Sequence, residues 1–435
     1  MTDTSRSILE MNAYSGGTET SPLLLRRQAN MGPAAILFYR EPLELQRASG
    51  AWLEATDGTR YLDCYNNVPS VGHCHPRVVE AVSRQIGLLN VHSRYLTEIV
   101  ESYLERLLAT FPEHLAHAVL TCSGSEANDL AMRMAIRATG NRGFIVTEAA
   151  YHGNTAAVAD VSPSSWKSGH VPDHVRLVPA PSADAYGPSV AEGFAAAVAN
   201  AARDLGEAGY GLAAFICDSV FSSDGIHADP EGFLAPAIDA VHAAGGLYIA
   251  DEVQPGFGRL GHGMWGFTRH GVAPDIVTMG KPMGNGFPMA GLVGRHELFA
   301  QFCEDTGYFN TFGGNPVAAA AGMAVLDCIG EEDLIGNAAR SGRLLMEGLT
   351  SIAAENNRIR ALRGTGLFIG IELAKTDVPA GEGVARLIDA LRQRQVLIGA
   401  AGRTGETLKL RPPLCLSASE VDFFLDALRL ALREA

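Results

Sequence analysis

The middle of the chain alternates between two patterns of hydrophobic and polar residues. From about residue 118 to residue 290, short and almost continuous apolar runs are followed by segments with helical spacing of apolar residues. The runs read HAVLTCS, RGFIVTE, GLAAFICDS, GLYIADEV, DIVTMGK and AGLVG. Such runs are typical of strands buried on both faces. Because they alternate with helical patterns, they indicate a doubly wound α/β sheet.

The two ends of the chain follow other patterns and predict a smaller α+β domain. Residues 51–68 hold an Asp57-Gly58 turn between two partly alternating runs, which predicts a β-hairpin. Residues 1–50 are expected to be irregular. Further predicted elements are helices at 76–89 and 97–108, an alanine-rich helix after Asn315, a long helix to 355, strand-like runs GLFIGIEL, VLIGAAG and TLKLRPPL, and a helix at 418–434.

These patterns divide the chain into three parts. We expect an N-terminal segment, 1–60, that contributes to the small domain. A large α/β domain over 61–315 and a C-terminal α+β domain over 316–435 follow it. No internal repeat interrupts this order.

Composition and charge exclude several functions. The 435 residues are 47% hydrophobic, which is enough for a large core, and the net charge is −14. An acidic chain is a poor candidate for nucleic-acid binding, which requires clustered Lys and Arg. No run approaches the ~18 apolar residues of a membrane span. Seven scattered cysteines without a CxxC pair, and an N-terminus without an apolar signal segment, predict reduced thiols and a cytoplasmic protein.

The stretch GHCHP at 72–76 is the one constellation that resembles a metal site. Zinc requires three or four ligands that converge. His73, Cys74 and His75 are adjacent, and adjacent residues of an extended chain point to opposite faces. We therefore expect a turn here and no metal.

In open α/β sheets, ligands bind beyond the carboxyl ends of the strands, so the polar residues that follow each apolar run are the candidates. The first such stretch is TCSGSEAND at 121–129, where a Ser-Gly-Ser turn precedes a helix. A helix N-terminus binds anions through its free N–H groups and its dipole. Phosphate binding and a simple serine cap remain equally good interpretations of these residues.

The second stretch is YIADEVQPGFGRLG at 248–261. Its glycines spell GxGxxG, but the dinucleotide fingerprint opens a helix directly after the strand, and here five residues intervene. Asp251 is the stronger candidate, because a carboxylate at the end of an apolar strand is costly to bury without a partner. The alternative is a carboxylate that only caps a loop.

The third candidate is Lys281, one of four lysines in the chain, which ends the run DIVTMG before a Pro/Gly turn. A lysine that extends its stem over apolar surface is the structural alternative. A lysine desolvated in a cleft has a lowered pKa and is a nucleophile toward aldehydes. A phosphate cradle, a carboxylate and such a lysine are together the groups that pyridoxal phosphate requires.

Five stretches in order carry a more specific resemblance: SGSEAND, AYHGNT, IADEVQPGFGR, PDIVTMGKPMGNG and NTFGGNP. With them the chain resembles the class III aminotransferases over nearly its whole length. The resemblance implies the fold-type I architecture, in which a large domain with a mixed, mostly parallel seven-stranded sheet lies between helices. It also implies a homodimer with shared active sites, or a tetramer of such dimers, that acts on small amines and oxo acids.

The resemblance also assigns roles to residues. Lys281 is expected to form the internal aldimine and to shuttle the proton, and Asp251 to pair with the pyridine nitrogen. Ser123, Gly124 and Ser125 are expected to hold the phosphate. The cofactor ring is expected to lie among Tyr151, His152, Val253 and Gln254, and Thr311 to reach the phosphate of the neighbouring subunit. Glu252 is expected to be structural support.

The stretches 61–81, 89–96 and 408–415 are most similar to the branch that contains the ethanolamine-phosphate phospho-lyases. Arg411, Arg94, Asn67 and Tyr14 are the expected substrate residues. Arginine binds carboxylate bidentately and also suits phosphate. The resemblance implies a lysine at this position in the phospho-lyases, so Arg411 favours a carboxylate. Asp218 replaces a glutamate that in some relatives neutralises the substrate arginine, which puts that switch in doubt.

The predicted function is transfer of an amino group from a small amine or amino acid to an oxo acid. The alternative is elimination of phosphate or ammonia from a small phosphorylated or phosphonate amine. A binding protein without catalysis would not need the lysine.

Overall fold

The computed structural model describes residues 10, 21–34, 36–167, 169–374 and 380–434. Its centre is a seven-stranded sheet in the order β4-β10-β9-β8-β7-β5-β6. The strands are β4 (His117–Thr121), β5 (Gly143–Thr147), β6 (Val175–Val178), β7 (Leu212–Cys217), β8 (Leu247–Asp251), β9 (Ile276–Met279) and β10 (Ala290–Gly294). The pairs from β6 to β9 are parallel, and β10 runs antiparallel to both β9 and β4. This confirms the predicted mixed, mostly parallel sheet.

Helices cover both faces of this sheet because its strands are apolar on both sides. On β7, Ala214 and Ile216 join the core cluster of helix α4 (Gly124–Thr139), whereas Phe215 and Cys217 join the cluster of α7 (Val190–Glu207) and α8 (Ala235–Ala243). Successive strand residues point to opposite faces, so continuous apolar runs require this double cover.

The start of helix α4 is defined by hydrogen bonds between Ser123 and Glu126. The Ser123 side chain accepts from the Glu126 N–H, and the Glu126 carboxylate accepts from the Ser123 N–H, which is a capping box. Gly140 ends the helix in the left-handed conformation with φ 70°. The capping box fixes the helix N-terminus directly after β4.

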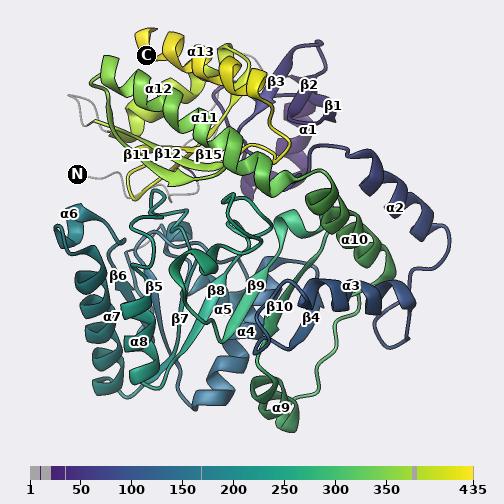
Figure 1. Cartoon of the computed structure of the whole chain (residues 1–435), viewed down its shortest axis with the longest axis vertical. Helices are drawn as coiled ribbons and strands as arrows, with labels where there is room; N and C mark the ends of the chain where they lie inside the picture. The colour runs from purple at the N-terminus through teal and green to yellow at the C-terminus, as the bar shows by residue number, and fades with distance from the viewer. Residues whose placement is uncertain (1–9, 11–20, 35, 168, 375–379, 435) are drawn as a thin grey trace.

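The smaller part of the molecule lies above the carboxyl ends of the large sheet (Figure 1). The antiparallel sheet β11-β12-β15-β14 lies beneath three helices, and a second sheet has the order β1-β2-β3-β13. The strands are β1 (Leu45–Ser49), β2 (Trp52–Ala55), β3 (Arg60–Asp63), β11 (Ile359–Thr365), β12 (Phe368–Leu373), β13 (Val396–Leu397), β14 (Gly399–Ala401) and β15 (Thr407–Leu410). The covering helices are α11 (Leu334–Glu355), α12 (Ala380–Gln393) and α13 (Ala418–Glu434).

The second sheet joins the two ends of the chain, because β3 pairs in parallel with β13 through Val396 and Leu62. The predicted hairpin is present as the antiparallel pair β2 and β3. Strand β3 extends past the expected domain limit at residue 60, into the range assigned to the large domain. The limits themselves stay predictions.

The remaining helices connect or flank these layers. They are α1 (Pro22–Met31), α2 (Pro76–Ile86), α3 (Glu98–Leu108), α5 (Ala156–Ala159), α6 (Ala183–Tyr186), α9 (His296–Asp305) and α10 (Pro316–Glu331), with short 3₁₀ turns at Gly32–Ala34, Pro163–Ser165, Gly266–His270 and Lys281–Gly284. The expectation that residues 1–50 are irregular was wrong for α1 and β1. Helix α1 begins with a Ser21 cap and Pro22, a start signal that its polar sequence obscured. Among the described residues no helix is long and apolar enough to cross a membrane.

Candidate active site

Five strands of the large sheet deliver polar residues to one edge. Strands β4, β5, β7, β8 and β9 all point the same way, and a cavity of about 350 Å³ lies beyond their carboxyl ends. Its lining includes nine of the ten predicted cofactor residues: Ser123, Gly124, Ser125, Tyr151, His152, Asp251, Val253, Gln254 and Lys281. Parallel strands therefore bring together residues that are up to 158 positions apart, between Ser123 and Lys281.

The floor of the cavity at one end is the N-terminus of α4. The first N–H groups of a helix have no partner within the helix, and Ser123 satisfies only that of Glu126. The Ser125 hydroxyl accepts from the Asn154 N–H at 3.2 Å, which ties this turn to the loop after β5. This end of the cavity is therefore built to receive an anion.

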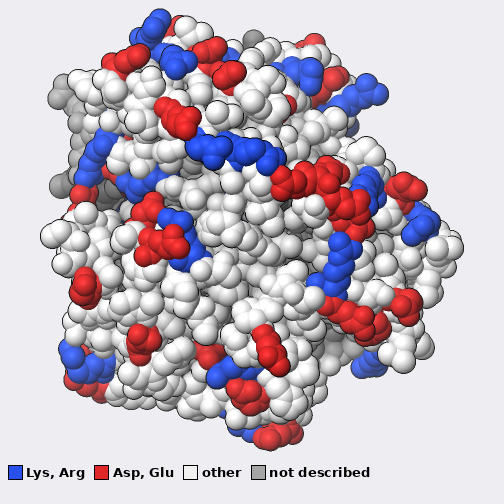
Figure 2. All heavy atoms as spheres, viewed as in Figure 1, with Lys and Arg blue, Asp and Glu red and all other residues white. Residues whose placement is uncertain are grey.

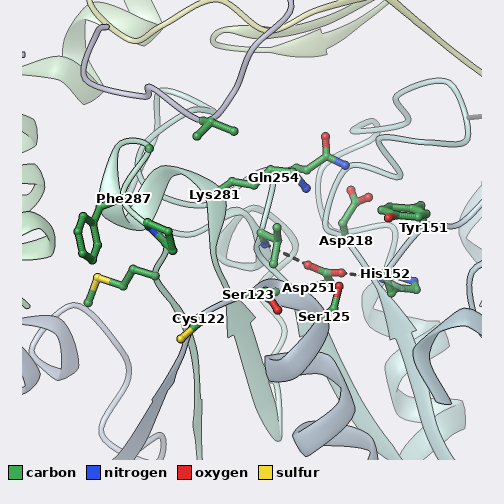
Figure 3. A pocket seen from close by; sticks show the side chains of 17 residues that line it. Cys122, Ser123, Ser125, Tyr151, His152, Asp218, Asp251, Gln254, Lys281 and Phe287 are labelled. Carbon is green, nitrogen blue, oxygen red and sulfur yellow. Dashed lines mark hydrogen bonds and ion pairs between the residues drawn. The ribbon is translucent and has the colours of Figure 1, made fainter. Parts of the chain in front are cut away.

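Asp251 is held as an acceptor by three donors. One carboxylate oxygen, Oδ2, lies 2.7 Å from His152 Nδ1 and accepts from Asn128 Nδ2 at 3.1 Å. The other, Oδ1, accepts from the Val253 N–H at 3.1 Å. Asp251 is only 4% exposed, and Figure 3 shows its carboxylate among the residues that line the cavity, with His152 beside it. These three hydrogen bonds fix the orientation of the carboxylate, which lines the cavity.

Asn128 is a functional residue that the sequence analysis did not single out. Its amide donates to Asp251 and to the His152 carbonyl at 2.8 Å, and its Oδ1 accepts from Thr278 Oγ1 at 2.7 Å. Asn128 is buried on the sheet-facing side of α4. A polar residue on an otherwise apolar helix face was the available signal.

Lys281 follows β9 and extends over the cavity toward the side of Asp251 and Asp218 (Figure 3). Burial lowers the pKa of its ammonium group, and the Asp251 carboxylate partly opposes this effect. The residue has φ 31°, in the left-handed region that non-glycine residues rarely adopt. Strain of this kind costs about 1–3 kcal/mol and is typical of functional positions.

Gln254 connects the cavity to Arg411. Its Oε1 accepts from Arg411 Nη1 at 2.6 Å, and its Nε2 donates to Ser222 Oγ at 2.8 Å. The Asn67 amide lies 3.5 Å from the same Oε1. Arg411 itself is not among the residues that line the cavity, and its guanidinium lies 5.5 Å from the centre of the Tyr65 ring. Two expected substrate residues, Arg411 and Asn67, therefore meet the cavity through Gln254.

Asp218 lines the cavity but does not neutralise Arg411. Its carboxylate accepts from the N–H groups of Val220 and Ser222 and from Ser222 Oγ. Burial raises the pKa of this carboxyl group. The described hydrogen bonds of Asp218 lie within its own turn, so the doubt about a carboxylate switch at this position stays a prediction.

Lys409 is a second buried lysine near this site, and sequence analysis gave it no role. Its Nζ donates to the Ser222 carbonyl at 2.8 Å, and burial together with the Arg411 charge holds its pKa well below the ordinary value. The available signal was a lysine in the otherwise apolar run of β15, two positions before Arg411.

Two expected residues lie outside the cavity lining, and a third cannot be placed among the described residues. Thr311 is exposed and outside the cavity lining. Arg94 is exposed, with its guanidinium 4.0 Å from the centre of the Phe309 ring. Tyr14 lies outside the described residues. The roles proposed for these residues stay predictions.

Glu252 supports the loop that follows Asp251. Its carboxylate accepts from the N–H groups of Gly266 and Phe267 and from the Ser219 hydroxyl, and it is fully buried. Its side chain thus joins the ends of β7 and β8 to the turn at 266–270. This geometry agrees with a structural role.

Comparison with known proteins identifies the family. The sequence model of "Aminotransferase class-III" matches residues 39–432. The chain belongs to the class III aminotransferase family. It is 39% identical over 94% of its length to "Alanine--glyoxylate aminotransferase 2-like" of Drosophila melanogaster, of which 86% is covered. It is 36% identical over 92% of its length to "Ethanolamine-phosphate phospho-lyase homolog 1" of Caenorhabditis elegans, of which 90% is covered.

A solved structure supports the same conclusion. A phospholyase from Arthrobacter in complex with phosphoethanolamine superposes with a TM-score of 0.91 and 42% identity, over 95% of this chain and 100% of that one. The family consists of pyridoxal-phosphate enzymes, so the predicted cofactor and enzymatic nature are confirmed.

The cavity fits pyridoxal phosphate on three counts. A Cβ at Gly153 would lie 2.4 Å from Ser125 Oγ, so the cradle leaves room only for glycine. His152 Nε2 is buried without a hydrogen-bond partner among the described residues, as expected of a polar atom that meets a ligand. The donor set matches the cofactor chemically: Lys281 would hold its aldehyde, Asp251 its pyridine nitrogen and the α4 N-terminus its phosphate.

Replacing Gly153 with alanine should weaken cofactor binding. Gly153 has φ 146°, and the added Cβ would displace Ser125 from the cradle. We expect the dissociation constant of pyridoxal phosphate to rise roughly tenfold or more. Gly263→Ala is the matched control, because φ is 159° and the nearest atom is 3.6 Å away. Equal affinities of the two variants for pyridoxal phosphate would contradict the assignment of Gly153 and Ser125 to the phosphate site.

Asp224 should make stability fall as pH rises. It holds the chain before Tyr151, accepting from Thr147 Oγ1 at 2.6 Å and the Ala149 N–H at 3.0 Å, and burial raises its pKa to about 7. A raised carboxyl pKa stabilises the fold at acid pH, and this contribution is lost as pH rises through 7. Relative to Asp224→Asn, the free energy of unfolding of the wild type should fall by on the order of 1 kcal/mol per pH unit between pH 5 and 7. Urea unfolding of both proteins at each pH measures this difference. The same pH dependence of the unfolding free energy in both proteins would contradict the prediction.

Proposed function

We propose that the chain transfers an amino group between small amino acids and 2-oxo acids. The observation that supports this proposal most directly is that Arg411 is buried and has no paired carboxylate among the described residues. Its guanidinium donates to a neutral amide and is buried, and among the described residues no carboxylate is paired with it. The Asp63 carboxylate acts on the Arg411 charge but forms no ion pair with it among the described residues. A buried charge without a directly paired counter-ion is costly, so the site is better satisfied when the substrate supplies an anion.

This reasoning also limits the substrates. Enzymes that alternate between a substrate with a carboxylate at this position and one without it need a group that neutralises the arginine in the second case. Asp218 is engaged in its own turn and does not provide one. Both the amino donor and the oxo acceptor should therefore be anionic, as an amino acid and a 2-oxo acid are.

The cofactor, Lys281 and Asp251 would each have a separate role in the reaction. Pyridoxal phosphate, when bound, supplies an electron sink for the carbanion formed at the substrate Cα. Lys281 would remove the proton from that Cα, and its lowered pKa increases the fraction of neutral amine that can act as a base. Asp251 would keep the positive charge of the pyridine ring, with His152 and Asn128 fixing its orientation.

Elimination of phosphate from a small phosphorylated amine is the second candidate. Its support is the 42% identity to the Arthrobacter phospholyase and the buried Lys409, which lies close enough to Arg411 for their charges to interact. Two neighbouring cations suit a dianion such as a phosphate monoester better than a single carboxylate.

We also propose a homodimer in which Thr311 completes the site of the partner. The segment around Thr311 exposes large apolar side chains, Phe309 at 41% and Phe312 at 69%. The segment before α3 does the same with Leu88 at 72% and Leu96 at 92%. Exposed apolar groups of this size are typical of an interaction surface. All seven cysteines are free thiols, which supports the proposed cytoplasmic location.

One experiment separates the two reactions. Purified holoenzyme is incubated with phosphoethanolamine alone and, separately, with an amino acid donor and pyruvate. Alanine formed from pyruvate supports transamination. Phosphate release that requires no oxo acid would instead establish the lyase.

Arg411→Gln tests the anion site. The loss of a charge-assisted hydrogen bond, about 1.5–3 kcal/mol, should raise the KM for the oxo acid roughly 10- to 100-fold. The exposed pair of Arg340 with Asp333 provides the control Arg340→Gln, which should leave KM unchanged. An unchanged KM in Arg411→Gln would remove the basis of this proposal.

A further inference from the structure

A cluster of three potential ligands lies outside the active site, between α2 and α10. His75 precedes the first residue of α2, and Cys328 lies in the last turn of α10, which Glu332 directly follows. His75 Nδ1 is 3.5 Å from Cys328 Sγ, and His75 Nε2 is 3.1 Å from Glu332 Oε1. One ligand atom from each of these side chains lies within 4.8 Å of the other two.

We propose that His75, Cys328 and Glu332 bind a divalent transition-metal ion of the zinc type, with water as the fourth ligand. Imidazole nitrogen, thiolate sulfur and carboxylate oxygen are the three donor types that zinc uses in proteins. Three protein ligands and one open position form a recognised coordination pattern for this ion.

The geometry requires only a small rearrangement. Ligand atoms at 2.0–2.3 Å from a tetrahedral ion are separated by about 3.4–3.7 Å from one another. One imidazole gives a single nitrogen to one ion, so Nδ1 beside the Cys328 sulfur is the natural choice. Glu332, which now lies beside Nε2, must then shift its carboxylate toward Nδ1, and its side chain is 39% exposed and can change rotamer.

The surroundings suit an ion as well. Cys328 is fully buried, the His75 side chain is 15% exposed, and Glu332 opens to solvent, so the site has a protected inner side and a path of entry. The nearby cation Arg77 is already paired with Glu331 at 2.7 Å and lies 3.6 Å from Asp327. Its charge is therefore balanced locally and does not oppose a second cation.

The fold also explains why adjacent residues in the motif do not share the site. His73 pairs with Asp63 at 2.6 Å, and its backbone bridges to Gly50. Cys74 is exposed and has φ 48°, which turns the chain between the two histidines. The sequence expectation that His73, Cys74 and His75 do not converge is correct. The partners of His75 come instead from a helix about 250 positions later.

An ion here would tie the start of α2 to the end of α10, which pack side by side (Figure 1). Val68, in the segment before α2, lines the active-site cavity, and the segment before α10 carries Thr311. The bound ion would thus brace two segments of the site without touching the cofactor. On the face shown in Figure 2, acidic and basic side chains are interspersed around the molecule.

Cobalt(II) is the probe that tests this site in the intact holoenzyme. A cysteine ligand gives cobalt a sulfur-to-metal charge-transfer band in the near ultraviolet, so the wild type should develop this band at one equivalent of Co²⁺. Cys328→Ser should lose the band, and the matched control Cys74→Ser, which changes the exposed thiol next to His75, should keep it. A band that survives in Cys328→Ser, or none in the wild type, would overturn the proposal.

Zinc affinity provides a second measurement that does not depend on the buried thiol. Glu332→Gln changes an exposed side chain and should leave the fold and cofactor absorbance intact. We expect its Zn²⁺ dissociation constant by calorimetry to be about 10- to 100-fold higher than that of the wild type. The neighbouring Glu331→Gln should bind zinc as the wild type does, because Glu331 faces Arg77. Equal affinities of wild type and Glu332→Gln would contradict the site.

Discussion

Lys281→Ala is expected to lose the visible absorption band of the covalently held cofactor and about 10⁴-fold or more of the turnover. The first effect follows because Lys281 is the lysine whose side chain lines the cavity. The second follows because the same amine would act as the base at the substrate Cα, a role worth 10²–10⁴-fold by itself. Absorption spectra and steady-state rates measure both effects.

The control for this variant is Lys409→Met, which keeps the stem length of the other buried lysine near the site. It should retain the visible band. Lys281→Ala should also be at least as stable as the wild type, because the change removes an amine whose pKa burial has lowered. A variant with the band intact would show that the wrong lysine has been assigned.

Asp251→Asn should reduce turnover by on the order of 10²–10³-fold while the protein still binds pyridoxal phosphate. The amide keeps the size of the side chain and an acceptor for the Val253 N–H, but it removes the negative charge opposite the pyridine nitrogen. An electrostatic contact that stabilises charge formed during the reaction is worth this amount. Single-turnover measurement of Cα–H cleavage, with a deuterated substrate, isolates the affected step.

Asp224→Asn is the matched comparison for that experiment. Asp224 is also a buried carboxylate, but it bonds to Thr147 and Ala149 and does not line the cavity. It should change turnover by less than about tenfold. If the two variants behaved alike, the loss in Asp251→Asn would reflect general damage to the fold and not the lost charge.

The sequence predicted the sheet and the cofactor site well because both depend on local patterns. The apolar runs that end in Cys217, Asp251 and Met279 are buried strands, and polar residues follow each one at the same edge. The parallel direction of these strands converts regular spacing along the chain into proximity in space. Sequence patterns were therefore sufficient to assign Ser123, Asp251 and Lys281 to one cavity.

Residues whose role depends on tertiary contacts were beyond such reasoning. Asn128 looks like an ordinary helix residue, and only the position of α4 over β8 and β9 places it against Asp251. Strands β6 and β11 were not predicted, because arginines interrupt their apolar runs, and β6 has only four residues. Arg363 of β11 is paired with Glu372 of the neighbouring strand, a tertiary contact that the local pattern does not reveal. The link from Arg411 to Gln254 likewise needs the small domain above the large one.

The most direct test of the central claim is to find which lysine holds the cofactor. The chain has only four lysines, Lys167, Lys281, Lys375 and Lys409, so reduction of the holoenzyme with borohydride followed by peptide mass mapping is unambiguous. We predict a single pyridoxyl group on the peptide that contains Lys281. A pyridoxyl group on Lys409, or none on any lysine, would contradict the site described for this chain.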